Sequence, residues 1–352
     1  KNKCFVFAFF LLSFFFGLRG FVQSDFQNYY PWFEDLPSLW NYQSFFKSLE
    51  GNYEHGFVVF TALCKSIIPN YFFWVFVSSL IDVLLLQIIF KRYSTNVCLS
   101  FAIYFAIGAI IMEFNLMRNI KAILILIFAL KYIHNKKMWK YFFCVFLATL
   151  FHLTSVIFIP LYFVLGKKWP KMVLLGIFMI CITVLFLHIR FLSFLLPKIA
   201  SVLGGELAIM IEFYLASGVL DSSYGVSLGL TFAFVFYFYG KWVDKTGDKY
   251  IFANMMVIYF MCFSLLAEMS VLLERFAYFF AISYCVFYPN LLKVIKISSN
   301  KTLVCCFIFL IFTLKIAQQT QTIVCKYDNI LFGVESFENR LNILNYYNAN
   351  IK

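Results

Sequence analysis

The feature that most constrains the fold is a series of apolar stretches, several of them long enough to cross a lipid bilayer. The stretch YFFWVFVSSLIDVLLLQIIF, residues 71–90, contains Asp82 as its single charged residue. A helix needs about 20 apolar residues to span the hydrocarbon core. Only 13% of the whole chain is charged, too little to cover a soluble domain of 352 residues. The sequence therefore predicts an all-α, polytopic integral membrane bundle.

About ten membrane segments are predicted, forming a single integral membrane domain over residues 1–352. They are 4–18, 71–90, 97–113, 117–133, 141–165, 172–190, 225–240, 250–268, 273–292 and 302–318. The first resembles a signal peptide, but no A-x-A-like cleavage site follows it, so we interpret it as a retained helix. The polar remainder comprises an outer loop at 19–55, extended by a surface helix to give 19–70, an outer loop at 191–224, and a tail at 319–352 that is expected to be periplasmic.

The loops between the segments are rich in Lys and Arg, which predicts the side of the membrane on which they lie. Basic loops face the cytoplasm. The most basic are Lys91/Arg92, Lys131–Lys140, Lys167–Lys171, Lys241–Lys249 and Lys293–Lys301. The net charge of +12 is spread over these loops rather than gathered in one patch. We interpret it as an orientation signal and expect no nucleic-acid partner.

Two of these basic loops flank segment 141–165 and can share one side only if that segment does not cross. We therefore predict a re-entrant hairpin whose tip is His152, in the run LATLFHLTSVIFIP near the outer leaflet. Irregular backbone at membrane depth requires protein or a water-filled cavity around it. The alternative is one straight crossing, with a loop of three lysines outside.

The outer region 19–55 is acidic and aromatic. Its acids include Asp25 and, near its end, Glu54. Its aromatic residues include Tyr29. Sugars stack on aromatic faces and their hydroxyls need acceptors, but Tyr and Trp also favour any membrane interface. Both interpretations stay open. Residues 56–68 are too short to span and predict a helix on the outer surface, with an apolar face of Phe57, Phe60, Cys64, Ile67 and Ile68.

Ionisable residues at membrane depth are costly and indicate function. Arg118 and Arg275 begin helices whose N-termini are predicted to face outward, where an arginine opposes the helix dipole unless an anion is present. With His152 they predict a diphosphate site, because a guanidinium bonds two phosphate oxygens at once. The alternatives are snorkelling to lipid headgroups and pairing with Glu113 and Glu274.

Other polar signals are less specific. Asp82 is either a proton-relay residue or a buried acid bonded to a neighbouring helix. The ten cysteines include no C-x-x-C pair and no His/Cys cluster at zinc spacing, so we interpret most as small hydrophobes. The sequence has no D-x-D, G-x-G-x-x-G or P-loop motif, which argues mildly against a nucleotide-sugar transferase or an ATP-driven pump. We expect no metal and no cofactor.

Five short motifs carry a family resemblance. They are D-F-Q-N-Y from Asp25, N-Y-E-H-G-F around Glu54, R-N-I-K-A from Arg118, L-A-T-L-F-H-L-T-S from Leu147 and E-R-F-A-Y-F-F from Glu274. In order and spacing, over residues 19–292, the chain resembles the EpsG-type, Wzy-like polymerases of O-antigen, capsule and exopolysaccharide. The family more often has R-Q where this chain has Arg118-Asn119, which leaves the role of Asn119 open.

The resemblance implies an enzyme of the bacterial inner membrane with its active site facing the periplasm. It would transfer a growing glycan from undecaprenyl diphosphate to a new lipid-linked repeat unit and release the lipid diphosphate. Arg118 and Arg275 would bind the diphosphate, and the base would be Asp25, Glu54 or His152. The residues expected to contact sugar are Tyr29, Asn119 and Tyr278.

The expected partners are undecaprenyl-diphosphate-linked oligosaccharides and membrane lipids, with a chain-length regulator protein as a further candidate. Two other functions stay open. A flippase of the same lipid-linked units is a transporter, and would also place charges at membrane depth. An O-antigen ligase shares donor and leaving group but uses the lipid A core as acceptor.

Overall fold

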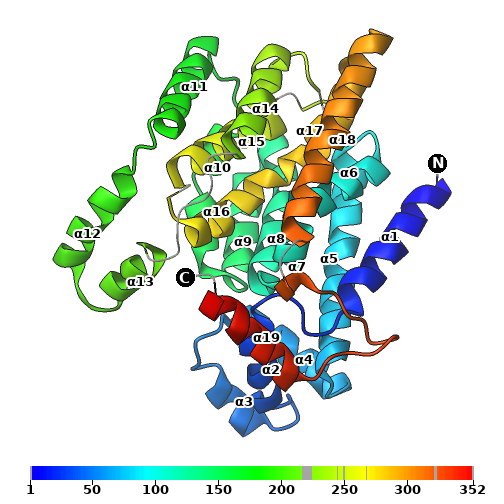
Figure 1. Cartoon of the computed structure of the whole chain (residues 1–352), viewed down its shortest axis with the longest axis vertical. Helices are drawn as coiled ribbons and strands as arrows, with labels where there is room; N and C mark the ends of the chain where they lie inside the picture. The colour runs from blue at the N-terminus through cyan, green and yellow to red at the C-terminus, as the bar shows by residue number, and fades with distance from the viewer. Residues whose placement is uncertain are drawn as a thin grey trace.

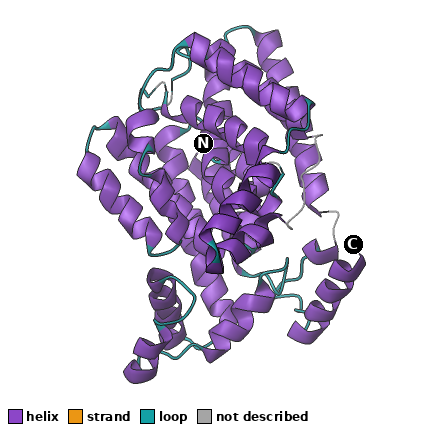
Figure 2. Ribbon diagram, turned by 90° about the vertical axis from the view of Figure 1, so that its left-hand side faces the viewer, coloured by secondary structure: helices purple, strands orange, loops and turns teal. Residues whose placement is uncertain are grey.

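The computed structural model describes residues 2–215, 224–243, 245–248, 250–266, 268–320 and 323–350. Over these residues the chain is helical, with isolated β-bridges in place of strands (Figures 1 and 2). The predicted all-α class is confirmed. The helices up to His134 are α1 (Asn2–Gly17), α2 (Phe26–Asp35), α3 (Tyr42–Ser48), α4 (His55–Ile67), α5 (Tyr71–Tyr93), α6 (Val97–Tyr104), the π-helical η1 (Phe105–Ala109), α7 (Ile110–Phe114) and α8 (Met117–His134).

The second half of the chain follows the same pattern of apolar helices. They are α9 (Met138–Thr149), the 3₁₀ helix η2 (Leu153–Phe158), α10 (Leu161–Val164), α11 (Lys171–Phe186), α12 (Phe191–Leu203), α13 (Gly205–Leu215), α14 (Tyr224–Phe238), α15 (Ile251–Leu266), α16 (Ser270–Ala281), α17 (Ser283–Val294), α18 (Ser298–Thr320), η3 (Ile323–Cys325) and α19 (Phe337–Asn350). The predicted outer region 191–224 therefore contains helices α12 and α13. Its acid Asp221 lies outside the described residues.

Three helices of the described chain are long and apolar enough to cross a membrane: Tyr71–Tyr93, Val97–Phe114 and Ser298–Ala317. A fourth span is possible if α11 and α12, which are bent by 88° at a short break, count as one. The chain is thus an integral membrane protein by helix length and composition. The remaining predicted segments fall on shorter or more charged helices, so the number of about ten segments stays a prediction.

Helix α8 lies at the centre of the bundle. It packs against α5, α7, α9 and α16, and its apolar residues are buried on nearly every side. A helix that is apolar all round is stable only when neighbours enclose it. Helix α8 is therefore held among four other helices.

Segment 141–165 folds back on itself. Helix α9 ends at Thr149, and after a turn through His152 the chain returns as η2 and α10. The hydroxyl of Tyr141 donates to the carbonyl of Phe158 at 2.8 Å, and the ring of Tyr141 packs against that of Tyr162. His152 thus lies at the turn between two antiparallel pieces. The re-entrant course of this hairpin through the membrane stays a prediction.

The helices α2, α3, α4 and α19 gather at one end of the bundle (Figure 1). The tail reaches this end because its backbone bonds the segment after α1: the amide of Ile330 donates to Leu18 O at 2.9 Å, and the amide of Gly20 to Asp328 O at 3.1 Å. The 19–55 region and the tail thus form one layer, which we call the outer layer.

The predicted apolar face of α4 is wrong in part. Phe57 and Cys64 are buried as expected, but so are Val58 and Ala62, while Ile67 is 66% exposed. The reason is that α4 is covered from two sides. One aromatic cluster contains Phe33, Phe57 and Trp74, and a second cluster joins Val58 and Ala62 to Leu36 and Phe45. The helix packs into the outer layer on two sides and leaves Val59, Leu63 and Ile67 exposed, so its position on the outer surface stays a prediction.

Candidate functional site

The carboxylate of Glu54 joins three elements at the outer end of the bundle. Arg118 Nη1, in the first turn of α8, lies 2.7 Å from Glu54 Oε2. His152 Nδ1, in the turn after α9, lies 3.2 Å from Glu54 Oε1, which also accepts a bond from the backbone amide of Leu153 at 3.3 Å. Three of the residues singled out in the sequence therefore meet at one point, although 98 positions separate Glu54 from His152.

The start of α4 is docked directly onto the turn that carries His152. The amide of Gly56 donates to the carbonyl of Leu150 at 2.8 Å, and the amide of Phe57 reaches the same oxygen at 3.3 Å. A Cβ atom at position 56 would lie only 2.7 Å from that oxygen. Glycine is therefore required for the close approach that brings Glu54 to His152.

The guanidinium of Arg118 is hydrogen-bonded through Nη1, whereas its Nε is unpaired among the described residues. It lies 4.8 Å from the ring centroid of Tyr53, is hydrogen-bonded to Glu54, and lies near the hydroxyl of Tyr29. Its Nε has no hydrogen-bond partner in the described part of the chain, and a quarter of the side chain is exposed (26%). The pairing with Glu113 that the sequence left open does not occur, since Glu113 bonds elsewhere. The contacts of Glu274 lie outside the described side chains.

Asp25 lies close to the same cations. The backbone amides of Ser24 and Asp25 both donate to Asn115 Oδ1, at 3.2 and 3.3 Å, and so tie the start of α2 to the residues just before α8. Burial raises the pKa of the Asp25 carboxyl to about 6, although the charges of Arg118 and Arg275 lower it. Asp25 therefore changes its charge near neutral pH.

The pKa of Glu54 is shifted in the opposite direction to that of Asp25. Burial raises its pKa, but hydrogen bonds from His152 and Arg118 and the charge of Arg118 outweigh burial and bring the pKa to about 2. Glu54 is thus ionised at neutral pH and can only accept hydrogen bonds. It follows that His152 donates through Nδ1, which leaves Nε2 of a neutral ring with a lone pair. This Nε2 is buried and has no partner within the described residues.

Helix α16 approaches the site from the other side. Asn119 donates through Nδ2 to the backbone carbonyl of Arg275 at 3.0 Å, and Asn119 is 95% buried. The ring of Tyr278 packs where Gly108, at φ +128°, interrupts the helix α6–α7, and a Cβ there would lie 2.8 Å from Cε1 of Tyr278. Asn119 thus ties the first turn of α8 to α16, and its contact with a sugar stays a prediction.

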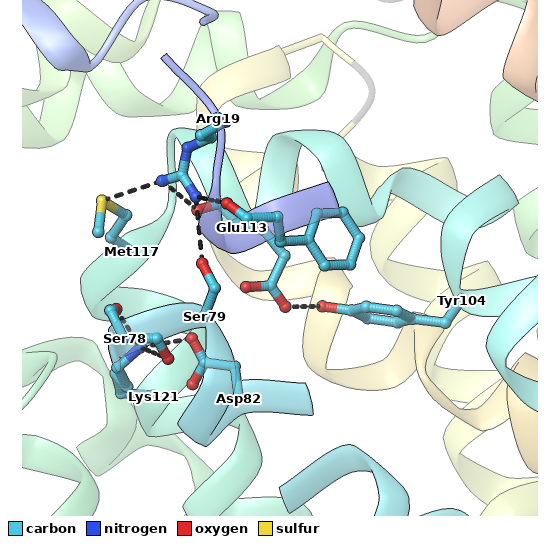
Figure 3. A network of polar contacts seen from close by, with 9 residues as sticks. Arg19, Ser78, Ser79, Asp82, Tyr104, Glu113, Met117 and Lys121 are labelled. Carbon is cyan, nitrogen blue, oxygen red and sulfur yellow. Dashed lines mark hydrogen bonds and ion pairs between the residues drawn. The ribbon is translucent and has the colours of Figure 1, made fainter. Parts of the chain in front are cut away.

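A second set of buried charges, absent from the predicted site, joins the neighbouring helices (Figure 3). Arg19 is 97% buried after the end of α1. Its guanidinium donates to Phe16 O at 2.7 Å, to Ser79 Oγ at 3.2 Å and to Glu113 O at 3.0 Å. The sequence places this arginine in the outer loop 19–55 and does not predict its burial. The only sequence feature that indicates burial is its position directly after an apolar helix.

Lys121 and Asp82 form an ion pair in this buried layer, and Lys121 also donates to Ser78 Oγ at 2.7 Å. Tyr104 donates to Glu113 Oε1 at 2.7 Å. Of the two interpretations of Asp82, the structure shows the bond to a neighbouring helix. We call Arg19, Asp82, Glu113 and Lys121 the buried charge network; it joins α5, α7 and α8 just below Arg118.

In a comparison with known protein families, the model of the EpsG family matches residues 2–329. No curated protein and no solved structure matches the chain. Among the described residues, no three His, Cys, Asp or Glu side chains come together as metal ligands would.

Proposed function

The chain belongs to the EpsG family, and from this premise we propose that it is a membrane-embedded polymerase of lipid-linked oligosaccharide repeat units. It acts at the periplasmic face of a bacterial inner membrane and uses an undecaprenyl-diphosphate-linked glycan as donor. The observation that carries the proposal is the bonding of Glu54 to both Arg118 and His152. This contact unites a candidate anion-binding group and a candidate base in one place.

The reaction forms one glycosidic bond and breaks the bond between the donor sugar and its diphosphate. The acceptor hydroxyl oxygen attacks the anomeric carbon, and the electron pair of the broken bond leaves on the diphosphate oxygen. Arg118 and Arg275 stabilise the charge that develops there, because preorganised cations need no rearrangement during the reaction. The hydroxyl proton passes to a base.

His152 is the base that the geometry favours. Its Nδ1 is bonded to the ionised Glu54, which fixes the ring and leaves Nε2 as the proton acceptor, the arrangement found in hydrolase triads. Asp25, with a pKa of about 6, is the second candidate. Glu54, with a pKa of about 2, is a weak base and acts as the orienting group. Tyr278 offers its ring to the sugar, whereas the ring of Tyr29 is buried against Tyr53, Phe57 and Trp74 and supports the site from behind. Asn119 positions α16.

The topology belongs to the same proposal. About ten segments cross or enter the membrane, and the hairpin of α9, η2 and α10 enters from the cytoplasmic side and brings His152 to the outer leaflet. The protein surrounding this turn supplies the environment that irregular backbone requires at membrane depth. The outer layer then covers the site from the periplasm.

The test is the surface glycan of a deletion strain complemented with variants. A polymerase predicts that deletion reduces the glycan ladder to a single repeat unit, and that His152→Ala does the same at normal protein level. Loss of every repeat unit from the surface would indicate a ligase, and accumulation inside the cell a flippase. Wild-type chain length in the His152→Ala strain would remove this histidine from the site.

A further inference from the structure

A basic cavity of about 520 Å³ lies at the end of the bundle opposite Glu54. Helix α5 separates the two ends: its 23 residues span about 35 Å, from the aromatic cluster of the outer layer to the rim of this cavity. The cavity is lined by the start of α6, at Thr95 and Asn96, by the end of α17, and by Lys245, Lys293 and Lys301. The described residues that line it include no aspartate or glutamate.

The floor of the cavity is fixed by hydrogen bonds. The amide of Thr95 donates to Asn290 Oδ1 at 2.8 Å, and the hydroxyl of Thr95 donates to Pro289 O at 2.8 Å. Lys245 is held through Nζ, which donates to Lys91 O at 2.8 Å. Lys301 lies in the first turn of α18, where a cation opposes the helix dipole. Three cations and two helix starts around one cavity favour an anion.

An apolar groove of about 460 Å³ also reaches the first turn of α18. It lies between α14 and α18 and is lined by Leu230, Phe234, Tyr237 and Leu303. The first turn of α18 borders both: Asn300 lines the groove, and the next residue, Lys301, lines the basic cavity. The charged cavity and the apolar groove therefore both border the first turn of one helix, which is long enough to span a membrane.

We propose that the two cavities together bind one anionic phospholipid of the surrounding membrane. Its phosphate lies among Lys245, Lys293 and Lys301, and an acyl chain lies in the groove between α14 and α18. Basic pockets between membrane helices recognise phosphate headgroups in this way. The site is distinct from the proposed polymerase site and does not depend on that function.

The test is a titration of the purified full-length chain in detergent with dioleoyl phosphatidylglycerol, counting bound lipid by native mass spectrometry. Each lysine near an anionic headgroup is worth about fivefold in affinity. The double variant Lys293→Gln, Lys301→Gln should therefore bind about 25-fold more weakly. Lys296→Gln is the matched control, because Lys296 is an exposed lysine of the same loop that does not line the cavity. It should stay within about twofold of the unaltered chain.

Two further arms separate a lipid from a free anion. Ala233→Phe, which fills the groove, should weaken binding of dioleoyl phosphatidylglycerol but not of a short-chain analogue. Dioleoyl phosphatidylcholine should bind at least tenfold more weakly. The proposal fails if the lysine variant and its control bind alike, if the two lipids bind alike, or if inorganic phosphate displaces the lipid with no effect of Ala233→Phe.

Discussion

Arg118 and Glu54 show why the type of residue matters as well as its charge. The guanidinium of Arg118 bonds Glu54, reaches Tyr29 and lies against Tyr53 at the same time. A lysine has a single nitrogen and cannot make this planar set of contacts. The role proposed for Arg118 therefore depends on its shape.

Arg118→Lys should keep the positive charge and the fold but lower the polymerisation rate about 10²–10³-fold, the usual loss when a donor to developing charge is removed. The measurement is the glycan length distribution at matched protein level. Snorkelling to lipid gives a different expectation, since lysine snorkels as well as arginine. Long, normally distributed chains in this strain would defeat the diphosphate assignment.

Asp25 and Glu54 should give opposite pH dependences of stability. The pKa of Asp25 is raised from 3.8 to about 6, so the folded state binds its proton more tightly, and its contribution to stability grows as the pH falls from about 6 to 4. The pKa of Glu54 is lowered from 4.5 to about 2, so its contribution is present above pH 4.5 and is lost as the pH falls toward 2.

Thermal unfolding of the purified chain between pH 3 and 7 measures both effects. Asp25→Asn should remove the gain on acidification between about pH 6 and 4, and Glu54→Gln should flatten the loss below about pH 4.5. Identical pH profiles for the two variants would contradict the assigned environments.

At the scale of helices, the buried charge network explains how α8 is held. Lys121 and Asp82 join α8 to α5, and both side chains are almost fully buried. The sequence marked Asp82 as a charge at membrane depth but did not identify Lys121 as its partner, because helix periodicity says nothing about which neighbouring face each residue meets. Arg19 was missed for a related reason, since its burial results from the return of the chain against α5 and α7.

Asp82→Leu alone should destabilise the fold by about 3–5 kcal/mol, because it leaves the charge of Lys121 buried and unpaired. The double variant Asp82→Leu, Lys121→Met should recover most of this loss, since an apolar pair of similar volume is often neutral. The measurement is the free energy of unfolding in detergent for both variants and the unaltered chain. A double variant as unstable as the single one would show that the pair is not what holds α5 to α8.

For the whole molecule, the sequence predicted the fold class better than the contacts that bring its polar residues together. The length of the apolar stretches and their low content of charged residues are enough to predict that helices form. The docking of Gly56 on Leu150, which brings Glu54 to His152, depends on tertiary contacts and leaves no sequence period. The apolar face of α4 was predicted in part wrongly because two clusters, one of them aromatic, pack against that helix from two sides.

The predicted topology places Lys136, Lys168, Lys245 and Lys296 on the cytoplasmic side and Asp25 on the periplasmic side, as the positive-inside rule requires. Single cysteines at these positions, in a background without accessible native cysteines, should react with an impermeant reagent accordingly. Labelling of position 168 from the periplasm would rule out the re-entrant hairpin, because segment 141–165 would then cross the membrane.

The central claim is that the cluster of Glu54, Arg118 and His152 links lipid-bound repeat units. The most direct measurement is the product of the purified chain in liposomes supplied with undecaprenyl-diphosphate-linked repeat units and nothing else. We predict a ladder of extended glycans with one lipid diphosphate released for each new linkage, and no ladder with His152→Ala. Repeat units that cross the bilayer without being joined, or that are joined equally well by the His152→Ala protein, would contradict the claim.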